Sequence, residues 1–153
     1  MPCARCLDSE VMKSRVTHVV AGVIFDRHRR LLACERPAGK AFAGKWEFPG
    51  GKVEKNESLA HALERELKEE LALDNVLVMD EMYSMEVCLS PEKCLILHFL
   101  RVLCNDTVEV TSCEGQQFRW LKKDELFSVD WLATDHDFVG YINRCYNLQD
   151  AVI

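Results

Sequence analysis

The sequence predicts an α/β domain in which a mixed β-sheet lies between helices. Runs of strand-forming residues come first, one strongly amphipathic helix follows, and further strands precede a final helix. This order is typical of helices layered on a sheet. The chain has 153 residues, 48% of them hydrophobic, which fits one domain with a substantial core.

We expect residues 1–14 to be a loose polar segment and residues 15–153 to form the single folded domain. No run of 18 apolar residues occurs, which predicts that the chain does not cross a membrane. The first residues lack the apolar core of a signal peptide, and the eight cysteines show no framework spacing. These features predict reduced thiols and a cytoplasmic protein.

Cys3 and Cys6 form a Cys-x-x-Cys pair at the start of the chain. A structural zinc site would require a second pair with matching spacing, and the sequence has none. A metal or redox role for this pair is one alternative. An ordinary chain terminus is the other, and we favour it.

The overall charge is acidic, with a formal net charge of −6 and a pI near 5.4. An acidic chain lacks the broad positive surface of a nucleic-acid binder, so we expect no nucleic-acid polymer as partner. Binding a polyanionic molecule would require cations at a local site or bound metal ions. The acidic surface, with no obvious exposed apolar stripe, favours a monomer or a small homodimer.

The first half of the sequence predicts three strands. Residues 16–25 are rich in Val and Ile and predict a buried strand, and residues 31–34 continue apolar after a polar turn, which suggests a hairpin. Residues 36–45 contain Pro, Gly and cations and predict a loop. Residues 46–48 form a short alternating strand that Pro49 and the following glycines end.

Residues 58–71 give the clearest helix. Ser58 is a suitable N-cap, and leucines recur every four residues along one face. The remaining elements are expected as strands and one last helix. The strands cover residues 76–78, 83–89, 95–103, 108–111 and 118–121, and the helix covers residues 135–146.

Three carboxylates occupy one patch of the predicted helix, opposite its leucines. Glu66, Glu69 and Glu70 lie at i, i+3 and i+4, in the last turns, where like charges repel and the helix dipole disfavours anions. A divalent cation such as Mg²⁺ would resolve this conflict, because it binds carboxylate oxygens and bridges to phosphates. A solvated acidic face, partly balanced by Arg65 and Lys68, is the alternative from the helix alone.

The wider spacing resembles a known family. Gly51, Glu57, Arg65, Glu66, Glu69 and Glu70 stand at the typed positions of the Nudix box of Nudix hydrolases. The chain departs from the box at Ala72, where the family usually has Gly. An alanine in the left-handed conformation costs on the order of 1 kcal/mol, so we expect a differently shaped helix end with Asn75 as the turn residue.

The resemblance implies an α/β/α sandwich that hydrolyses a nucleoside diphosphate linked to another moiety. It implies that Glu57 and Arg65 pair to brace the loop. It also implies that Mg²⁺, or Mn²⁺ in its place, is bound by several groups of the box and a later loop. These groups are the carbonyl of Gly50 and the side chains of Glu66, Glu69, Glu70 and Glu114.

Further segments resemble the MutT-like branch of the family, namely residues 44–54, 114–116, 120–121 and 130–135. This branch hydrolyses nucleoside triphosphates to a monophosphate and pyrophosphate. The resemblance implies an enzyme of nucleotide-pool sanitation that acts on oxidised or non-standard nucleotides, such as 8-oxo-dGTP or cytosine nucleotides. Glu66, Glu69 and Glu114 are the candidates for the general base, and the sequence does not choose among them.

Five residues are candidate contacts to the nucleotide, each with a structural alternative. Arg36 and Lys52 flank the Gly-rich turn and would contact phosphate, or else be surface charges. Phe48 would wall the base pocket, or pack in the core. Trp131 would stack on the base, or pack in the core. Asp135 would read a base edge, or cap the last helix.

Two other functions remain open on the sequence. One is a different Nudix diphosphate hydrolase, acting on a nucleotide sugar, ADP-ribose or a dinucleotide. The other is a non-catalytic nucleotide sensor, which loss of a metal carboxylate would indicate. All the candidate carboxylates are present, which favours catalysis.

Overall fold

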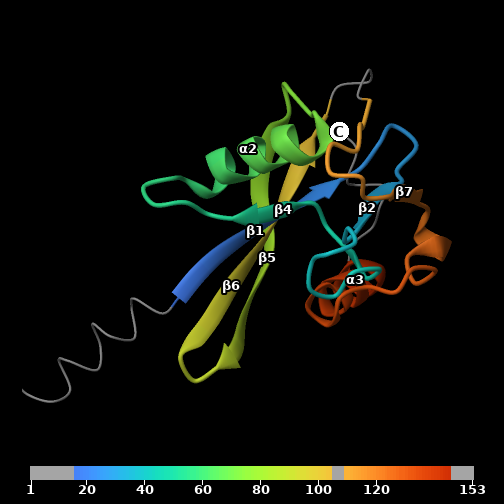
Figure 1. The fold of residues 1–153 in the computed structure, drawn as a ribbon. Helices are drawn as coiled ribbons and strands as arrows, with labels where there is room; N and C mark the ends of the chain where they lie inside the picture. The colour runs from blue at the N-terminus through green and yellow to red at the C-terminus, as the bar shows by residue number, and fades with distance from the viewer. Residues whose placement is uncertain (1–15, 105–108, 146–153) are drawn as a thin grey trace, which may run out of the picture.

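The structure, a computed structural model, describes residues 16–104 and 109–145 of the chain. The described residues form three layers (Figure 1), with a β-sheet between the helices α2 (Leu59–Leu71) and α3 (Ala133–Cys145). The predicted α/β/α sandwich with a mixed sheet is confirmed. The expected loose segment 1–14, with Cys3 and Cys6, lies outside the described residues.

The central sheet has the strand order β4-β1-β6-β5. Its strands are β4 (Gly50–Lys52), β1 (Val16–Ile24), β6 (Lys93–Leu103) and β5 (Leu77–Ser90). β1 runs parallel to β6, while β4 and β5 pair antiparallel with their neighbours, so the sheet is mixed. The predicted strands 76–78 and 83–89 belong to one strand, β5, which contains register shifts.

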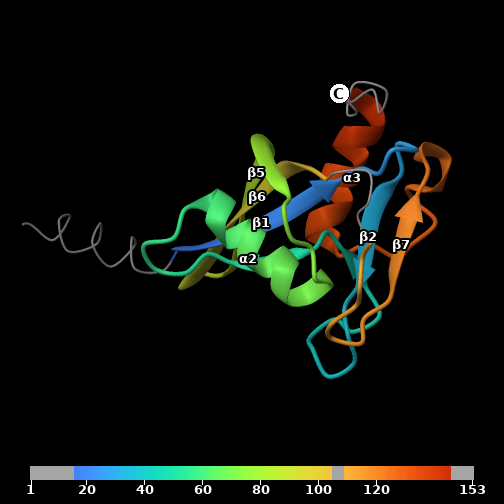
Figure 2. The same cartoon turned by 90° about the horizontal axis from the view of Figure 1, so that it is seen from above.

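A second, antiparallel sheet has the order β3-β2-β7 and lies beside α3 (Figure 2). Its strands are β3 (Trp46–Glu47), β2 (Leu31–Glu35) and β7 (Phe118–Leu121), and a 3₁₀ turn covers Lys123–Glu125. The predicted hairpin between β1 and β2 is wrong, because these strands meet at a single bridge between Phe25 and Leu31. Both edges of β1 are already paired with β4 and β6, so β2 has no edge to join.

The two faces of the central sheet pack against different helices. On one face, the leucines of α2 that include Leu63 and Leu67 are fully buried against Val20 and Leu100. On the other face, Phe99 packs against the α3 side chain of Phe138, with ring centroids 4.1 Å apart. The alternation of side chains along β1 and β6 therefore supplies both cores.

The predicted helix 58–71 is confirmed as α2. The prediction for its first residues is confirmed, whereas the prediction for its last turn is not. Ser58 caps it by accepting a hydrogen bond from the backbone N–H of His61. At the other end Ala72 itself is left-handed, with φ 53° and ψ 30°, and its N–H donates to the Lys68 carbonyl. The expectation of a differently shaped end is therefore wrong, although Asn75 is also left-handed at φ 57°.

Other elements differ from the predictions in extent. The final helix begins at Ala133 rather than at residue 135, and β4 was not expected. Of the predicted strand 108–111, residue 108 lies outside the described residues, and residues 109–111 form no strand. Thr111 instead donates its backbone N–H to the carbonyl of Leu71, which ties this segment to the end of α2.

The thiols also depart from the expectation in part. Cys88 and Cys94 form a disulfide, so the prediction of reduced thiols is wrong for these two. Cys34 is buried and unbonded, and burial together with the nearby charges of Glu70 and Glu47 raises the pKa of its thiol. Among the described residues, no helix is long and apolar enough to cross a membrane.

The left-handed Ala72 predicts that Ala72→Gly stabilises the protein. Glycine adopts this conformation without the steric cost that a Cβ incurs, so we expect about 1 kcal/mol more unfolding free energy. Urea denaturation measures the change. Ala60→Gly, inside the same helix, is the control and should lose about 1 kcal/mol. A loss of stability in Ala72→Gly would contradict the left-handed helix end.

Candidate active site

A guanidinium joins the Gly-rich turn to α2. Arg65 donates from Nε and Nη2 to the two carboxylate oxygens of Glu57, at 2.8 and 2.9 Å, and from Nη2 to the carbonyl of Lys52 at 3.1 Å. The Glu57 carboxylate also accepts from the backbone N–H of Glu54. These bonds lower the pKa of Glu57 to about 2. The geometry is the brace that the family resemblance implied.

Two glycines let this turn lie close to other groups. Gly50 has φ 156°, and a Cβ there would clash with the backbone carbonyl of Val20. A Cβ on Gly51 would lie 2.5 Å from the carboxylate of Glu66. Glycine is therefore required at Gly50, where the neighbour is backbone, whereas a side chain at Gly51 would push the Glu66 carboxylate away from the turn.

Glu70 is surrounded by other carboxylates. Burial, and then the charges of Glu66, Glu114 and Glu47, raise its pKa to about 8. Glu114 comes from the loop that precedes β7, and Glu47 comes from β3. Glu66 and Glu114 thus lie near enough to Glu70 for their charges to act on it, while the metal-binding role that the resemblance implies for Gly50, Glu66, Glu69, Glu70 and Glu114 stays a prediction. Glu47 joins this group from β3, and no spacing in the sequence relates it to the box.

Cations hold most of these carboxylates. Arg65 Nη1 lies 2.9 Å from Glu66 and 3.6 Å from Glu69, and Lys40 lies 3.3 Å from Glu114. The carboxylates are therefore paired with cationic side chains rather than gathered around one point. Glu69 differs from its neighbours in exposure, since 59% of its side chain is accessible, compared with 16% for Glu66.

A buried glutamine positions the Glu114 loop against the end of α2. Gln116 is 7% exposed, and its amide donates to the carbonyl of Glu70 at 3.3 Å. Its amide oxygen accepts from the backbone N–H of Glu114 at 3.0 Å and from the Ser112 hydroxyl at 2.8 Å. The backbone N–H of Cys113 also donates to Glu70. Gln116 therefore sets where Glu114 lies relative to the box.

Arg36 lies beside the acidic cluster and is held by the protein. Its Nη1 donates to Glu47 at 2.9 Å, and its Nε donates to the carbonyl of Ala41 at 2.7 Å. Burial raises the pKa of Glu47, and Arg36 opposes that rise. Arg36 thus reaches the site, while its predicted contact with phosphate stays a prediction.

Lys52 projects toward the α3 side of the central sheet. It is exposed and lies opposite Val19 in the antiparallel β1–β4 pair. Residues directly opposite each other project from the same face, and Val19 packs on the α3 side. Lys52 therefore leaves the Gly-rich turn toward that side, while its predicted contact with phosphate stays a prediction.

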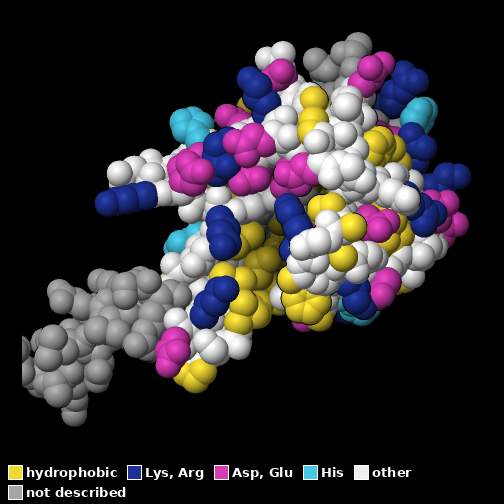
Figure 3. Space-filling view, viewed as in Figure 1, with side chains coloured by type: hydrophobic (Ala, Val, Ile, Leu, Met, Phe, Trp, Pro, Cys, Tyr) yellow, Lys and Arg dark blue, Asp and Glu magenta, His cyan; other side chains and the backbone are white. Residues whose placement is uncertain are grey.

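A hollow with hydrophobic side chains opens between the part of the molecule that carries α2 and the part that carries α3 (Figure 3). Acidic side chains gather above it, over α2. The sheet provides apolar surface on the α3 side through partly buried residues. These residues are Val19, Met82, Met85, Val87 and Leu95. An apolar hollow under a row of carboxylates suits a ligand with a flat ring and a charged tail.

Phe48 and Trp131 pack in the core rather than in this hollow. Each is 4% exposed, and their rings stack with centroids 5.0 Å apart. The indole N–H of Trp131 donates to the carbonyl of Leu126 at 2.6 Å. The structure favours the core alternative for both side chains, and the predicted role of Phe48 at the base pocket stays a prediction.

Asp135 does not cap α3. It lies within the first turn, is 4% exposed, and its carboxylate accepts from the backbone N–H of Phe48 at 3.3 Å. Burial, and then the charge of Glu47, raise its pKa to about 8. The side chain is therefore mainly protonated at neutral pH, and it links α3 to the strand that leads into the Gly-rich turn.

The fold and the site define a class of protein: a three-layer α/β/α domain with a carboxylate-bearing helix after a Gly-rich turn. Residues 16–139 match the NUDIX domain model, and the chain belongs to the Nudix family. Enzymes of this family generally use divalent metal ions.

Several relatives resemble this chain. It is 45% identical over 64 residues to an 8-oxo-dGTP diphosphatase from Proteus vulgaris, covering 42% of this chain and 57% of the relative. It is 48% identical over 60 residues to a CTP pyrophosphohydrolase from Escherichia coli (strain K12), covering 39% of this chain and 44% of the relative. The crystal structure of a MutT protein from Methanosarcina mazei Go1 matches this fold with a TM-score of 0.74 at 25% identity. The match covers 84% of this chain and 94% of that protein.

The donor set fits a divalent metal ion. Carboxylate oxygens are the ligands that hard divalent cations prefer. Burial, and then the charges of neighbouring carboxylates, raise the pKa of Glu70. A bound cation would relieve the repulsion among these carboxylates. Glu66, Glu70 and Glu114 would hold such an ion once Glu66 is released from Arg65 and Glu114 from Lys40.

The protonated Asp135 predicts a pH-dependent effect of Asp135→Asn. The folded pKa of about 8 lies above the unfolded value of about 4, so the folded wild type binds the extra proton between these values. Wild-type stability should therefore fall as pH rises from 4 to 8, whereas the neutral asparagine avoids this loss. In urea denaturation, the unfolding free energy of the variant relative to wild type should rise by on the order of 1 kcal/mol per pH unit over this range.

Asp137→Asn, an exposed position on the same helix, is the matched control. Its difference from wild type should stay flat over the same pH range. A flat difference for Asp135→Asn as well would contradict the protonated state of Asp135.

Proposed function

We propose that this protein is a Mg²⁺-dependent nucleoside triphosphate diphosphatase, with Mn²⁺ able to replace Mg²⁺. It would hydrolyse oxidised or non-standard nucleoside triphosphates to a monophosphate and pyrophosphate. The observation that carries the proposal is that Glu66 rests against Gly51 of the Gly-rich turn and that Glu66 and Glu114 both act on the charge of Glu70, while acidic side chains of α2 lie above an apolar hollow. The names of the relatives from Proteus vulgaris and Escherichia coli support the same class.

The residues around the turn would bind and orient the phosphates. Gly51 has no side chain, so the Glu66 carboxylate lies against the backbone of the turn, where it would face the metal-bound diphosphate. Lys52 projects to the α3 side and would pair with a phosphate oxygen. Arg36 lies at the same site, where Glu47 and the Ala41 carbonyl fix its guanidinium. A divalent ion supplies charge neutralisation and a more acidic water when bound.

A carboxylate would remove the proton from the attacking water. Glu66, Glu69 and Glu114 are the candidates, and each is now paired with a cation. Glu66 is held most firmly, by Arg65 and by the surface of Gly51. Arg65 would keep the chosen carboxylate in place through its bonds to Glu57, which does not itself face the reaction.

Asp135 would recognise the base. A protonated carboxyl offers one donor and one acceptor. This pair complements the O6 and N1–H of a guanine ring, and equally the N3 and amino group of cytosine. The residue therefore favours neither base by hydrogen-bond count, which is consistent with relatives named for 8-oxo-dGTP and for CTP.

A turnover panel with Mg²⁺ tests the proposal. It should contain the standard triphosphates, 8-oxo-dGTP, 5-substituted cytosine nucleotides, ADP-ribose and a nucleotide sugar, with separation of the products. We expect pyrophosphate release, with one triphosphate strongly preferred. Preference for ADP-ribose or the nucleotide sugar would show that the protein acts on another substrate class of the family. Tight nucleotide binding without turnover would indicate a sensor.

The proposed metal site predicts that Glu70→Gln is inactive in the same assay. Loss of this carboxylate should lower kcat at least about 100-fold, because a metal site contributes several kcal/mol of transition-state stabilisation. Glu64→Gln is the matched control, since Glu64 is exposed on the same helix, outside the acidic cluster. Steady-state kinetics and a thermal melt should show a folded, inactive Glu70→Gln. Wild-type activity in that variant would refute the assignment of the metal site.

Lys52→Gln should raise KM for the triphosphate about 10-fold with a smaller change in kcat, since the lysine would bind phosphate in ground and transition states alike. Lys55→Gln, in the exposed part of the same loop, serves as control. Initial-rate measurements over a range of nucleotide concentrations give both constants. An unchanged KM would show that Lys52 is a surface charge.

A further inference from the structure

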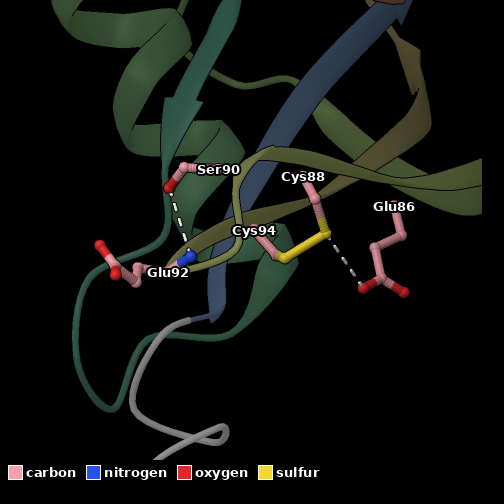
Figure 4. The surroundings of a disulfide bond; sticks show 5 residues. All are labelled: Glu86, Cys88, Ser90, Glu92 and Cys94. Carbon is pink, nitrogen blue, oxygen red and sulfur yellow. Dashed lines mark hydrogen bonds between the residues drawn. A yellow bond between two sulfur atoms is a disulfide. The ribbon is translucent and has the colours of Figure 1, made fainter.

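The β5–β6 hairpin carries a pair of directly opposed cysteines near its turn (Figure 4). Cys88 of β5 lies opposite Cys94 of β6, with the Cα atoms 4.0 Å apart and the sulfurs bonded. Directly opposed residues of an antiparallel pair have Cβ atoms about 4.5–5.5 Å apart. The strand register therefore keeps the two cysteine side chains adjacent when the bond is reduced.

A carboxylate lies beside this pair on the same strand. The Oε1 of Glu86 is 3.8 Å from the Sγ of Cys88 (Figure 4). The two sulfurs and a Glu86 oxygen all lie within 4.8 Å of one another, which makes these residues a potential three-ligand group. Glu86 and Cys88 are exposed and Cys94 is partly exposed, so an ion in solvent can reach all three.

We propose that, when the disulfide is reduced, Cys88, Cys94 and Glu86 bind a Zn²⁺ ion. Zinc takes thiolate and carboxylate ligands at about 2.3 and 2.1 Å in a tetrahedral arrangement, which sets its ligand atoms about 3.5–3.8 Å apart. Glu86 Oε1 already lies 3.8 Å from the Sγ of Cys88, and the two sulfurs, which are bonded in this structure, would move apart to that spacing on reduction. Water completes the fourth position, and the ion offsets the charge of two thiolates and one carboxylate.

This site is separate from the carboxylates of the Nudix box. The hairpin turn lies at the end of the sheet away from α2 (Figure 1). The ligand chemistry differs as well, because thiolates select Zn²⁺ whereas carboxylate clusters suit Mg²⁺. The proposal therefore does not rest on the proposed function, and excess Mg²⁺ should leave the zinc site unaffected.

Reduction controls access to the site. A dithiol reductant transfers two electrons and two protons to the Cys88–Cys94 bond, which breaks into two thiols while the reductant becomes a disulfide. Zinc then replaces the two thiol protons, since the metal binds thiolates. The bonded form shown in Figure 4 has no thiolate to offer, so oxidation removes two of the three ligands.

Cobalt titration of the reduced chain tests the proposal. The full chain with Cys3→Ser and Cys6→Ser should be used, so that the terminal Cys-x-x-Cys pair cannot contribute. We expect one equivalent of Co²⁺ to give a thiolate-to-metal absorption band that one equivalent of Zn²⁺ abolishes. The disulfide form should give no band, with its oxidation state verified by mass.

Variants separate this site from other thiols. In the same background, Cys94→Ser should abolish the band, and Glu86→Gln should weaken Zn²⁺ binding at least about 10-fold. Cys113→Ser, at an exposed unbonded cysteine, should leave the absorption band and the Zn²⁺ affinity unchanged. No band in the reduced protein, or a band that survives Cys94→Ser, would overturn the proposal. Unchanged affinity in Glu86→Gln would overturn the three-ligand site.

Discussion

The contact of Arg65 with the Gly-rich turn is the interaction on which the rest of the site depends. One guanidinium holds Glu57, the Lys52 carbonyl and Glu66, so it joins β4, the following loop and α2. Five donors in a rigid plane make this possible, and lysine could not reproduce it. Gly51 completes the arrangement, because any side chain there would displace the Glu66 carboxylate.

The acidic cluster is the feature that this frame supports, and it is costly for the folded protein. Burial and three neighbouring carboxylates raise the pKa of Glu70, which means that its charge is poorly tolerated. Natural proteins keep such conflicts mainly at functional sites. The cations Lys40, Arg36 and Arg65 reduce the repulsion. A bound divalent ion would compete with Lys40 for Glu114 and with one nitrogen of Arg65 for Glu66, while Arg65 keeps its bonds to Glu57.

The two sheets meet along one short segment and contribute different groups around it. The central sheet supplies Lys52 and apolar surface on the α3 side, while the second sheet supplies Glu47 and receives the chain after Glu114. Asp135 joins α3 to Phe48. Residues 46–52 run from β3 of the second sheet to β4 of the central sheet, so groups from both sheets lie beside this segment.

The sequence by itself determined an α/β fold with a mixed sheet and α2 with its leucine face, because these depend on local periodicity. The α/β/α sandwich and the Glu57–Arg65 brace were implied by the resemblance of the box to Nudix hydrolases. The core roles of Phe48 and Trp131, the contribution of Glu47 and the anchoring by Gln116 were decided by tertiary structure. The separation of β2 from β1 and the pairing of Cys88 with Cys94 were decided there too. Each depends on which strand edges and faces meet, and no spacing along the chain encodes that.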